Sequence, residues 1–142
     1  MDLIIIVADA DAILEKRQRD LEIALQTIRD CHLDQDDKPI SDRSVGGLAI
    51  RDFEAWLLAD SETVSRILGE KIEQITDLEN FTNSKDTLES AINQSSYINK
   101  PLLQIKWDLA FEIDLAILKS SCPKGYGAFA HKLALVVESM IR

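Results

Sequence analysis

The sequence has few cysteines, and this scarcity excludes two classes of small protein. Its 142 residues include only Cys31 and Cys122, which lie far apart and outside any Cys-x-x-Cys pattern. Two such residues are too few for a disulfide framework or for a cysteine-based zinc site. We therefore expect two free thiols, as in a protein of the reducing cytoplasm.

Basic residues are also in short supply. Sixteen lysines and arginines stand against twenty-five aspartates and glutamates, which gives a formal net charge of −9 at pH 7. A field of this sign repels phosphate, so the chain is a poor non-specific binder of nucleic acid. A local basic spot, or a bound divalent ion that inverts the local charge, is still compatible with a phosphate-bearing partner.

The sequence lacks a hydrophobic run long enough to cross a membrane. Its opening apolar run, residues 3–8, is interrupted by Asp9, whereas a spanning helix needs about 20 apolar residues. No basic segment precedes the run, so the pattern differs from that of a secretory signal peptide. We expect no membrane partner and a cytoplasmic location.

The residues that are present indicate an ordinary globular protein. Hydrophobic residues make up 46% of the chain and charged residues 29%, without an internal repeat or a low-complexity segment. A chain of this length buries roughly 70% of its unfolded surface, which is enough for one core. We therefore predict a single domain over residues 1–142.

The hydrophobic pattern predicts two strands and several helices. The continuous β-branched run at 3–8 is typical of a strand covered on both faces of a parallel sheet, and the segment 45–50 predicts a second strand entered through glycines. Helical spacing predicts helices over residues 13–31, 51–59, 61–68, 85–93, 102–119 (in one or two pieces) and 129–141. We predict a helix-rich α/β fold, with a small parallel sheet covered by five or six helices and a helical C-terminal part at about 84–142. Because two strands alone are marginally stable, we expect either a helix-heavy α/β domain or part of a larger sheet that another copy or another chain completes.

Two aspartates directly follow the first predicted strand. Ligands of parallel sheets bind outside the carboxyl ends of the strands, so Asp9 and Asp11 stand where a site is expected. Side chains two apart on an extended segment point the same way, and two carboxylates so placed repel each other unless a cation lies near them. Oxygen ligands favour Mg²⁺ or Mn²⁺. The structural alternative is that Asp11 caps the following helix and Asp9 is a turn residue.

A third acid, Glu54, is surrounded by large aliphatic residues on the predicted helix. Its helical neighbours are Ile50, Leu57 and Leu58, so we expect its carboxylate to be partly buried or beside a ligand. A buried charge is costly unless it is paired. Arg17, Arg51 or a metal ion are the partners that we considered, and a purely structural ion pair is the alternative.

Asp114 is the remaining unusual acid. Its helical neighbours are apolar, so we expect a buried acid with a structural role, satisfied by Lys100 or by N–H groups of a helix end. Among other polar or aromatic residues, we expect Trp56 and Trp107 to be core residues, His131 to be a satisfied core histidine and His32 to lie in a solvated loop.

The order of these motifs resembles that of a bacterial family of uncharacterised Toprim-like proteins, relatives of the topoisomerase-primase nucleotidyl-transfer domain. The specific part is residues 49–60, which read Ala-Ile-Arg-Asp-Phe-Glu-Ala-Trp-Leu-Leu-Ala-Asp. The strand ending in Asp-x-Asp and the following helix that carries Arg17 are more generic. The stretches 97–100 and 122–129 are similar to the C-terminal part of that family, so the resemblance spans nearly the whole chain.

The resemblance implies a Toprim-like core that binds magnesium through Asp9 and Asp11. It also implies metal-assisted phosphoryl transfer or hydrolysis of nucleic-acid phosphodiesters. Glu54 is then a candidate to complete the site as its catalytic residue, and Arg17 and Arg51 are candidates to hold phosphate.

One departure from the family qualifies this implication. Toprim domains carry a Glu near the end of an earlier strand, and this sequence begins at the Asp-bearing strand. We therefore expect an N-terminally truncated Toprim-like domain, either a fragment or split-gene half that acts with a partner chain, or a relative without catalysis.

Two alternatives to a Toprim-like enzyme stay open. One is a non-catalytic interaction protein whose exposed sheet edge pairs with another chain. The other is a different Asp-x-Asp enzyme, but a phosphatase of the Asp-x-Asp-x-Thr type needs Thr where this chain has Ile13.

Overall fold

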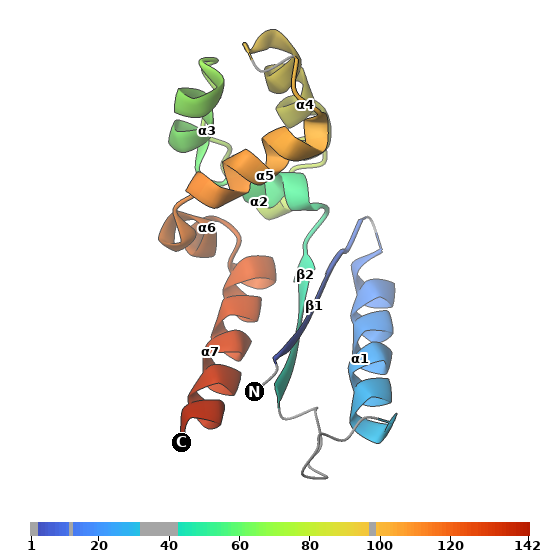
Figure 1. Ribbon diagram of the computed structural model, residues 1–142. Helices are drawn as coiled ribbons and strands as arrows, with labels where there is room; N and C mark the ends of the chain where they lie inside the picture. Colours follow the sequence, from blue (N-terminus) through green and yellow to red (C-terminus); the bar gives the residue numbers. More distant parts are fainter. Residues whose placement is uncertain (1–2, 12, 32–42, 97–98) are drawn as a thin grey trace.

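The computed structural model describes residues 3–11, 13–31, 43–96 and 99–142. Over these residues the chain forms two strands, seven α-helices and two short helical turns (Figure 1). In chain order they are β1 (Ile4–Asp9), α1 (Leu14–Cys31), β2 (Ser44–Ala49), α2 (Phe53–Leu58), α3 (Ser61–Leu68), η2 (Leu78–Asn80), α4 (Ser84–Gln94), α5 (Leu102–Glu112), α6 (Leu115–Ser121), η3 (Pro123–Gly127) and α7 (Ala128–Ile141).

The two strands form a parallel pair. Their register runs from Ile4 opposite Ser44 to Asp9 opposite Ala49, so both strands end at the same edge of the sheet. Among the described residues these strands form one two-stranded sheet. The predicted fold class, a helix-rich α/β protein with a small parallel sheet, is confirmed.

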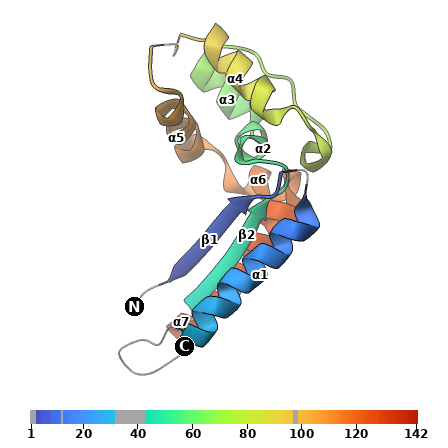
Figure 2. The same cartoon turned by 90° about the vertical axis from the view of Figure 1, so that its right-hand side faces the viewer.

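Helices α1 and α7 cover opposite faces of β2 (Figures 1 and 2). A glycine pair in β2 permits their close approach. A methyl group added at Gly46 would lie 2.8 Å from a methyl carbon of Leu21 in α1, and one added at Gly47 would lie 2.7 Å from the ring of Phe129 in α7. The sequence Gly46-Gly47 therefore brings a helix onto each face of the strand.

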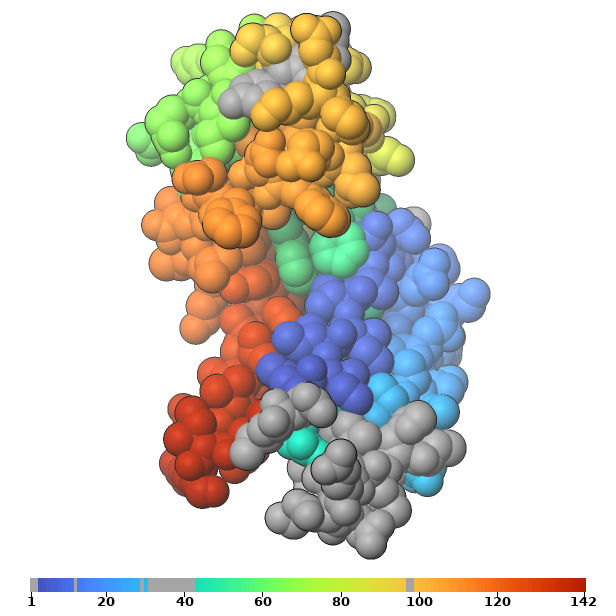
Figure 3. Space-filling model, viewed as in Figure 1, coloured from blue at the N-terminus to red at the C-terminus, as the bar shows by residue number. Residues whose placement is uncertain are grey.

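Strand β1 is much less covered than β2. Val45–Ala49 of β2 are all buried, whereas no residue of β1 is buried and Ile5 is 47% exposed. Figure 3 shows the atoms of this dark blue strand on the surface, between α7 and α1 and below α5. The apolar sequence of β1 is thus typical of a buried strand, but in this chain it forms an edge.

A second layer of helices, α2 to α5, lies beyond the carboxyl ends of the strands (Figure 1). Its core consists of fully buried leucines and isoleucines from several helices, including Leu58, Leu68, Leu88, Ile105 and Leu109. Capping residues set the helix ends. Asp52 and Asp60 cap α2 and α3 with their side chains, and Gly69 ends α3 with a left-handed φ of 72°. Both ends agree with the helix predicted over residues 61–68.

Three expectations for single residues are wrong. Trp107 is 64% exposed and His131 is exposed, so neither is a core residue. Asp114 is exposed rather than buried, because the chain breaks between α5 and α6 and turns it into the N-cap of α6. Its carboxylate accepts hydrogen bonds from the backbone N–H groups of Ala116 and Ile117. Its partners are thus the N–H groups of the helix that it begins, rather than Lys100 or a neighbouring helix end.

Trp56 lies against the core, as expected. It is half-buried and contacts the rings of Phe53, Tyr126 and Phe129, with centroid distances of 5.4, 5.3 and 6.5 Å.

His32 lies outside the described residues. In the part of the chain that the structure describes, no helix has the length and apolar character needed to span a membrane.

Candidate functional site

Four carboxylates gather where β1 and β2 end. Asp9 is the last residue of β1 and Asp11 lies two residues later, while Asp52 and Glu54 begin the helix that follows β2. The charges of Asp11, Asp52 and Glu54 all act on the Asp9 carboxyl. The parallel pairing places both strand ends at one edge, and this edge therefore collects the acids. We call these four residues the acidic edge.

The backbone at the acidic edge adopts an uncommon conformation. Beyond the strands, the N–H of Ala10 donates to the carbonyl of Ala49 at 2.9 Å and the N–H of Asp11 donates to the carbonyl of Arg51 at 2.7 Å. Asp11 and Arg51 face each other in this bridge, and both have left-handed φ values, 52° and 71°. Non-glycine residues in this region cost free energy and cluster at functional sites.

Asp9 is held by the backbone and is destabilised as an anion. Its Oδ1 accepts a hydrogen bond of 2.9 Å from the N–H of Phe53. Burial raises its pKa above the ordinary value of 3.8, the Phe53 hydrogen bond opposes this, and the charges of Glu54, Asp11 and Asp52 raise it further. The other carboxylate oxygen of Asp9 is repelled by the neighbouring acids, and a bound cation would offset this repulsion.

Asp11 is the more exposed of the two predicted metal ligands. Its Oδ2 lies 3.6 Å from Nη2 of Arg17, and the two side chains are 58% and 41% exposed. The Nε of Arg17 is buried without a hydrogen-bond partner in the described part of the protein. The structure therefore brings Arg17 to the acidic edge, as predicted, with one donor still to be satisfied. The backbone of Arg51 is also there, through its bridge to Asp11.

Asp52 was not singled out from the sequence, although it lies in the motif that carries the resemblance. Its Oδ1 accepts a hydrogen bond of 3.0 Å from the N–H of Ala55 and so caps α2. Burial raises its pKa, the Ala55 hydrogen bond opposes this, and the charges of Glu54 and Asp11 raise it. Two of the four carboxyl groups therefore have raised pKa values.

Glu54 is partly buried, as predicted, but its partner is a residue that we did not consider. Its Oε1 lies 2.6 Å from Nζ of Lys106 on α5, and the two side chains are only 12% and 18% exposed. Lys106 also lies 3.3 Å from Oε1 of Glu89 on α4. Burial alone raises the pKa of Glu54, but the hydrogen bond from Lys106 overcomes it and holds the pKa below its usual value. This cluster joins three helices.

A signal for Lys106 was present in the sequence. It is a single cation within a predominantly apolar helical stretch, between Leu102 and Leu109. Its neighbours three and four positions away, Leu102, Leu103, Leu109 and Ala110, are all apolar. A charge with such neighbours needs a partner of opposite sign, just as Glu54 does, and pairing the two satisfies both.

Two further buried acids accept hydrogen bonds from backbone N–H groups and do not belong to the acidic edge. Asp60 is 3% exposed and accepts hydrogen bonds from the N–H groups of Thr63 and Asp114. Glu79 is 7% exposed and accepts from the N–H groups of Lys124 and Gly125, at 3.0 and 2.6 Å. These are the buried structural acids of the fold, the role expected of Asp114.

The acidic edge offers a divalent ion two carboxylates rather than a closed cage. Within residues 3–11, 13–31, 43–96 and 99–142, no group of three or more His, Cys, Asp or Glu side chains is placed to hold a metal ion. Mg²⁺ usually keeps several waters and binds through one or two carboxylates together with substrate phosphates. Asp9 and Asp11 fit this donor set, because both bear oxygen ligands and the Asp11 charge already raises the Asp9 pKa.

Comparison with known proteins adds no family. No family of known proteins, no curated protein and no solved structure matches this chain. The Toprim-like resemblance therefore stays a prediction from the motif residues.

Proposed function

We propose that the acidic edge binds Mg²⁺ or Mn²⁺ and that the protein is a Toprim-like domain acting on nucleic-acid phosphodiesters, alone or with a companion chain. The observation that carries this proposal is the grouping of Asp9 with Asp11, Asp52 and Glu54 at the carboxyl ends of two parallel strands, with a raised Asp9 pKa. Such a perturbed carboxyl at a strand end is typical of a functional site.

The proposed roles follow the positions of the side chains. Asp9 and Asp11 hold the ion, which polarises a phosphoryl oxygen or activates a bound water when present. Arg17 provides a donor for phosphate through its guanidinium end, which lies 3.6 Å from Asp11 on a side chain that is 41% exposed. Arg51 is the second proposed phosphate-binding residue.

Glu54 has a narrower role in this proposal than the resemblance implies. Its lowered pKa keeps it ionised, so it is a weak proton acceptor near neutral pH. An ionised carboxylate fixed by Lys106 at 2.6 Å suits the orientation of a water molecule by accepting its hydrogen bond. We therefore propose that Glu54 positions the attacking water.

A net charge of −9 limits how the protein meets nucleic acid. Long-range attraction is absent, so contact depends on the metal ion and on the arginines at the acidic edge. We expect such a protein to act in the cytoplasm on a substrate delivered or held by another chain.

The test is a calorimetric Mg²⁺ titration of the wild type, Asp9→Asn and the control Asp20→Asn. Asp20 is exposed on α1, away from the acidic edge. The wild type and the control are expected to bind in the millimolar range, and Asp9→Asn at least about tenfold more weakly, because one of two ligand carboxylates is lost. A nuclease assay with the same three proteins follows. No heat at millimolar Mg²⁺, or equal binding by Asp9→Asn, refutes the proposal.

A second candidate function is that of a non-catalytic component of a complex. The observation that favours it is β1, an apolar strand without a buried residue and with Ile5 47% exposed. Exposed edge strands recruit other strands. A homodimer or a companion chain would cover β1, and light scattering tests the first of these directly. A strict monomer without a copurifying partner contradicts this function.

A further inference from the structure

Helix α5 carries an apolar face that is exposed. Another face of the helix holds Ile105 and Leu109 in the buried core of the helical layer. Leu103, Trp107 and Phe111, by contrast, are 63%, 64% and 92% exposed. Residues four apart on a helix lie one above the other, so these three form a continuous stripe, which we call the α5 stripe. Figure 3 shows α5 on the same face of the molecule as β1.

The α5 stripe is large enough for an interface. A Trp or Phe side chain presents about 150–250 Å², so at their exposures Trp107 and Phe111 present about 300 Å², and Leu103 brings the sum to about 400 Å². Two stripes in contact therefore remove about 800 Å² of apolar surface from water. Since about 65% of a homodimer interface is apolar, the whole interface would bury about 1,200 Å², the lower limit for a standard specific complex.

The charges around α5 complement those of a second α5 that runs in the opposite direction. Lys100 precedes the helix, whereas Glu112 and Asp114 lie at its carboxyl end. Trp107 is seven residues from Lys100 and seven from Asp114. A two-fold axis at Trp107 therefore sets Lys100 of each copy near Asp114 of the other. Lys100 is 52% exposed and lies 3.5 Å from Asp108 of its own chain, so the second acid extends an existing ion pair.

A lipid surface fits the α5 stripe less well than a second copy does. Helices that lie on membranes carry Lys and Arg on their polar face, which attract anionic lipids. Here the polar residues one position after each member of the stripe are Gln104, Asp108 and Glu112, and the chain has a net charge of −9. A different polypeptide is not required either, because α5 itself carries the charge order that complements it.

We infer that two copies of this chain form a symmetric dimer in which the α5 helices pack antiparallel through the α5 stripe. The two Trp107 rings meet at the axis, and Leu103 of each copy contacts Phe111 of the other. Central aromatic residues of this kind contribute most of the binding energy of an interface. Because the interface is small, we expect a dissociation constant of about 10–100 µM, so the monomer predominates at low micromolar concentration. The dimer does not require a metal ion at the acidic edge.

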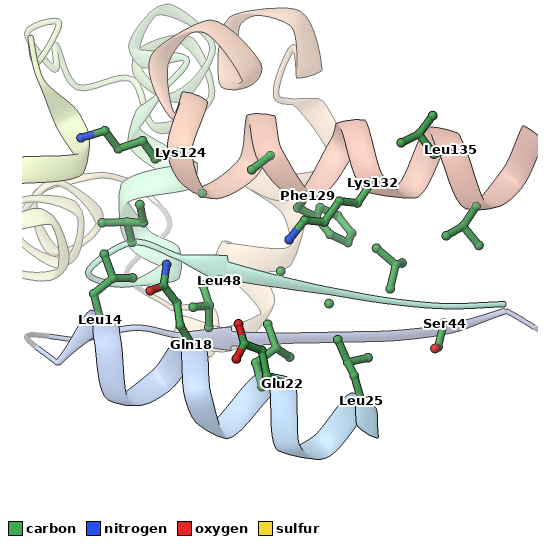
Figure 4. Close-up of a pocket in the computed structure, with 18 residues that line it drawn as sticks. Leu14, Gln18, Glu22, Leu25, Ser44, Leu48, Lys124, Phe129, Lys132 and Leu135 are labelled. Carbon is green, nitrogen blue, oxygen red and sulfur yellow. The ribbon is translucent and has the colours of Figure 1, made fainter. Parts of the chain in front are cut away.

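The test is sedimentation velocity of the full chain over a concentration range of about 2–500 µM. The test variant is Leu103→Glu. Its matched control is Leu135→Glu on α7, since Leu135 is 53% exposed and lines a separate cavity between α1 and α7 (Figure 4). Ile5→Glu is the control for the exposed strand β1. All three residues are exposed, so each variant should fold, and circular dichroism verifies that it does.

The wild type is expected to dimerise, and Leu103→Glu to dimerise at least about tenfold more weakly, because each copy would bury an unpaired carboxylate. Leu135→Glu and Ile5→Glu should match the wild type.

Lys100→Glu tests the orientation of the helices. In an antiparallel pair it sets like charges together at both ends of the interface and should weaken dimerisation about fivefold. Lys16→Glu, an equal charge change on an exposed residue of α1, should have no effect. In a parallel pair position 100 faces its own copy, so Lys100→Glu would change little.

Four outcomes overturn the inference. The first is a strict monomer at about 500 µM, well above the expected dissociation constant. The second is a dimer that Ile5→Glu or Leu135→Glu weakens and Leu103→Glu does not, which assigns the contact to β1 or α7. The third is an equal dissociation constant for Lys100→Glu and the wild type, which excludes the antiparallel arrangement. The fourth is a monomer that binds phosphatidylserine vesicles and loses this binding in Leu103→Glu, which assigns the stripe to a membrane surface.

Discussion

The pair formed by Glu54 and Lys106 is expected to dominate the pH dependence of stability in the helical layer. The substitution Lys106→Met keeps most of the apolar stem and removes the ammonium group. It leaves Glu54, which is 12% exposed, without its 2.6 Å partner. Loss of one member of a fully buried pair costs about 3–5 kcal/mol, and loss of a partner by a buried hydrogen-bonding group about 1–3 kcal/mol. Because some water reaches this site, we expect a loss of about 2 kcal/mol at pH 7.

The sign of the pH dependence is the sharper part of this prediction. In the wild type the pKa of Glu54 lies below 4.5, so the pair stabilises the fold above pH 4.5 and loses this effect as the pH falls through the lowered pKa. In Lys106→Met, burial, the largest influence on Glu54, still raises its pKa, and only the hydrogen bond from its own backbone N–H and the charge of Lys85 oppose it. Protonation then relieves the unpaired charge, so the difference between variant and wild type should shrink as the pH falls from 7 toward 4.5.

Urea unfolding and thermal unfolding, both followed by circular dichroism at several pH values, measure both effects. At pH 7 the melting temperature should fall by roughly 6 °C for a chain of this size. Glu54→Gln combined with Lys106→Met should recover much of the loss, because it removes the unpaired charge. The control Lys100→Met alters an exposed pair, 3.5 Å from Asp108, and should cost less than about 1 kcal/mol. A cost for Lys106→Met that is small, or equal at pH 4.5 and 7, would refute this account of Glu54.

Three further predictions concern packing, backbone conformation and thiol chemistry. In denaturant unfolding, Leu109→Ala should lower the free energy of unfolding by about 2–5 kcal/mol, because Leu109 is fully buried. Trp107→Ala should lower it by less than about 0.5 kcal/mol, because Trp107 is 64% exposed. Equal costs would contradict the assigned buried and exposed faces of α5. Gly69→Ala should cost about 1 kcal/mol because φ is 72° there and nothing crowds the site, and an unchanged unfolding midpoint would argue against this conformation. In a Cys31→Ser background, Cys122 should react with a thiol reagent only when the protein unfolds, because the residue is fully buried and burial raises its pKa to about 12. Rapid labelling of the native protein would contradict the burial of Cys122.

The sequence was sufficient for the secondary structure and for the parallel pairing. Residues 3–8 were predicted as a strand of a parallel sheet because their apolar run does not alternate, 45–50 were predicted as a second strand, and the structure pairs the two in parallel. The stop at Gly69 was also predictable, since glycine adopts a left-handed φ more easily than other residues. These features depend on local composition, which a single sequence records directly.

Which face of α5 is buried could not be predicted from the sequence in the same way. Apolar residues surround this helix, so periodicity does not say which side is covered, and Trp107 was assigned to the core although it is exposed. Asp114 was wrongly predicted to be buried for a related reason. A break in the backbone after Ile113 converts a position on an apolar helical face into a helix cap. Such breaks depend on tertiary packing.

At the candidate site, the sequence shows which acids follow the first strand but not what holds them. Asp9 and Asp11 were expected together because they end a strand, and Arg17 was expected nearby. The hydrogen bond from Phe53 to Asp9 and the pairing of Lys106 with Glu54 join residues that are 44 and 52 positions apart. Contacts at such separations depend on how the two layers are placed.

The two buried acids Asp60 and Glu79 connect segments of the chain that a cut in the backbone would separate. Asp60 joins the start of α3 to the start of α6, and Glu79 joins η2 to η3 just before α7. Cutting the chain between residues 81 and 113 would therefore leave two unpaired carboxylates in the N-terminal piece and three unpaired backbone N–H groups in the C-terminal piece. The helical layer and the strand layer should consequently melt together in one calorimetric transition, and neither should survive limited proteolysis as a stable fragment.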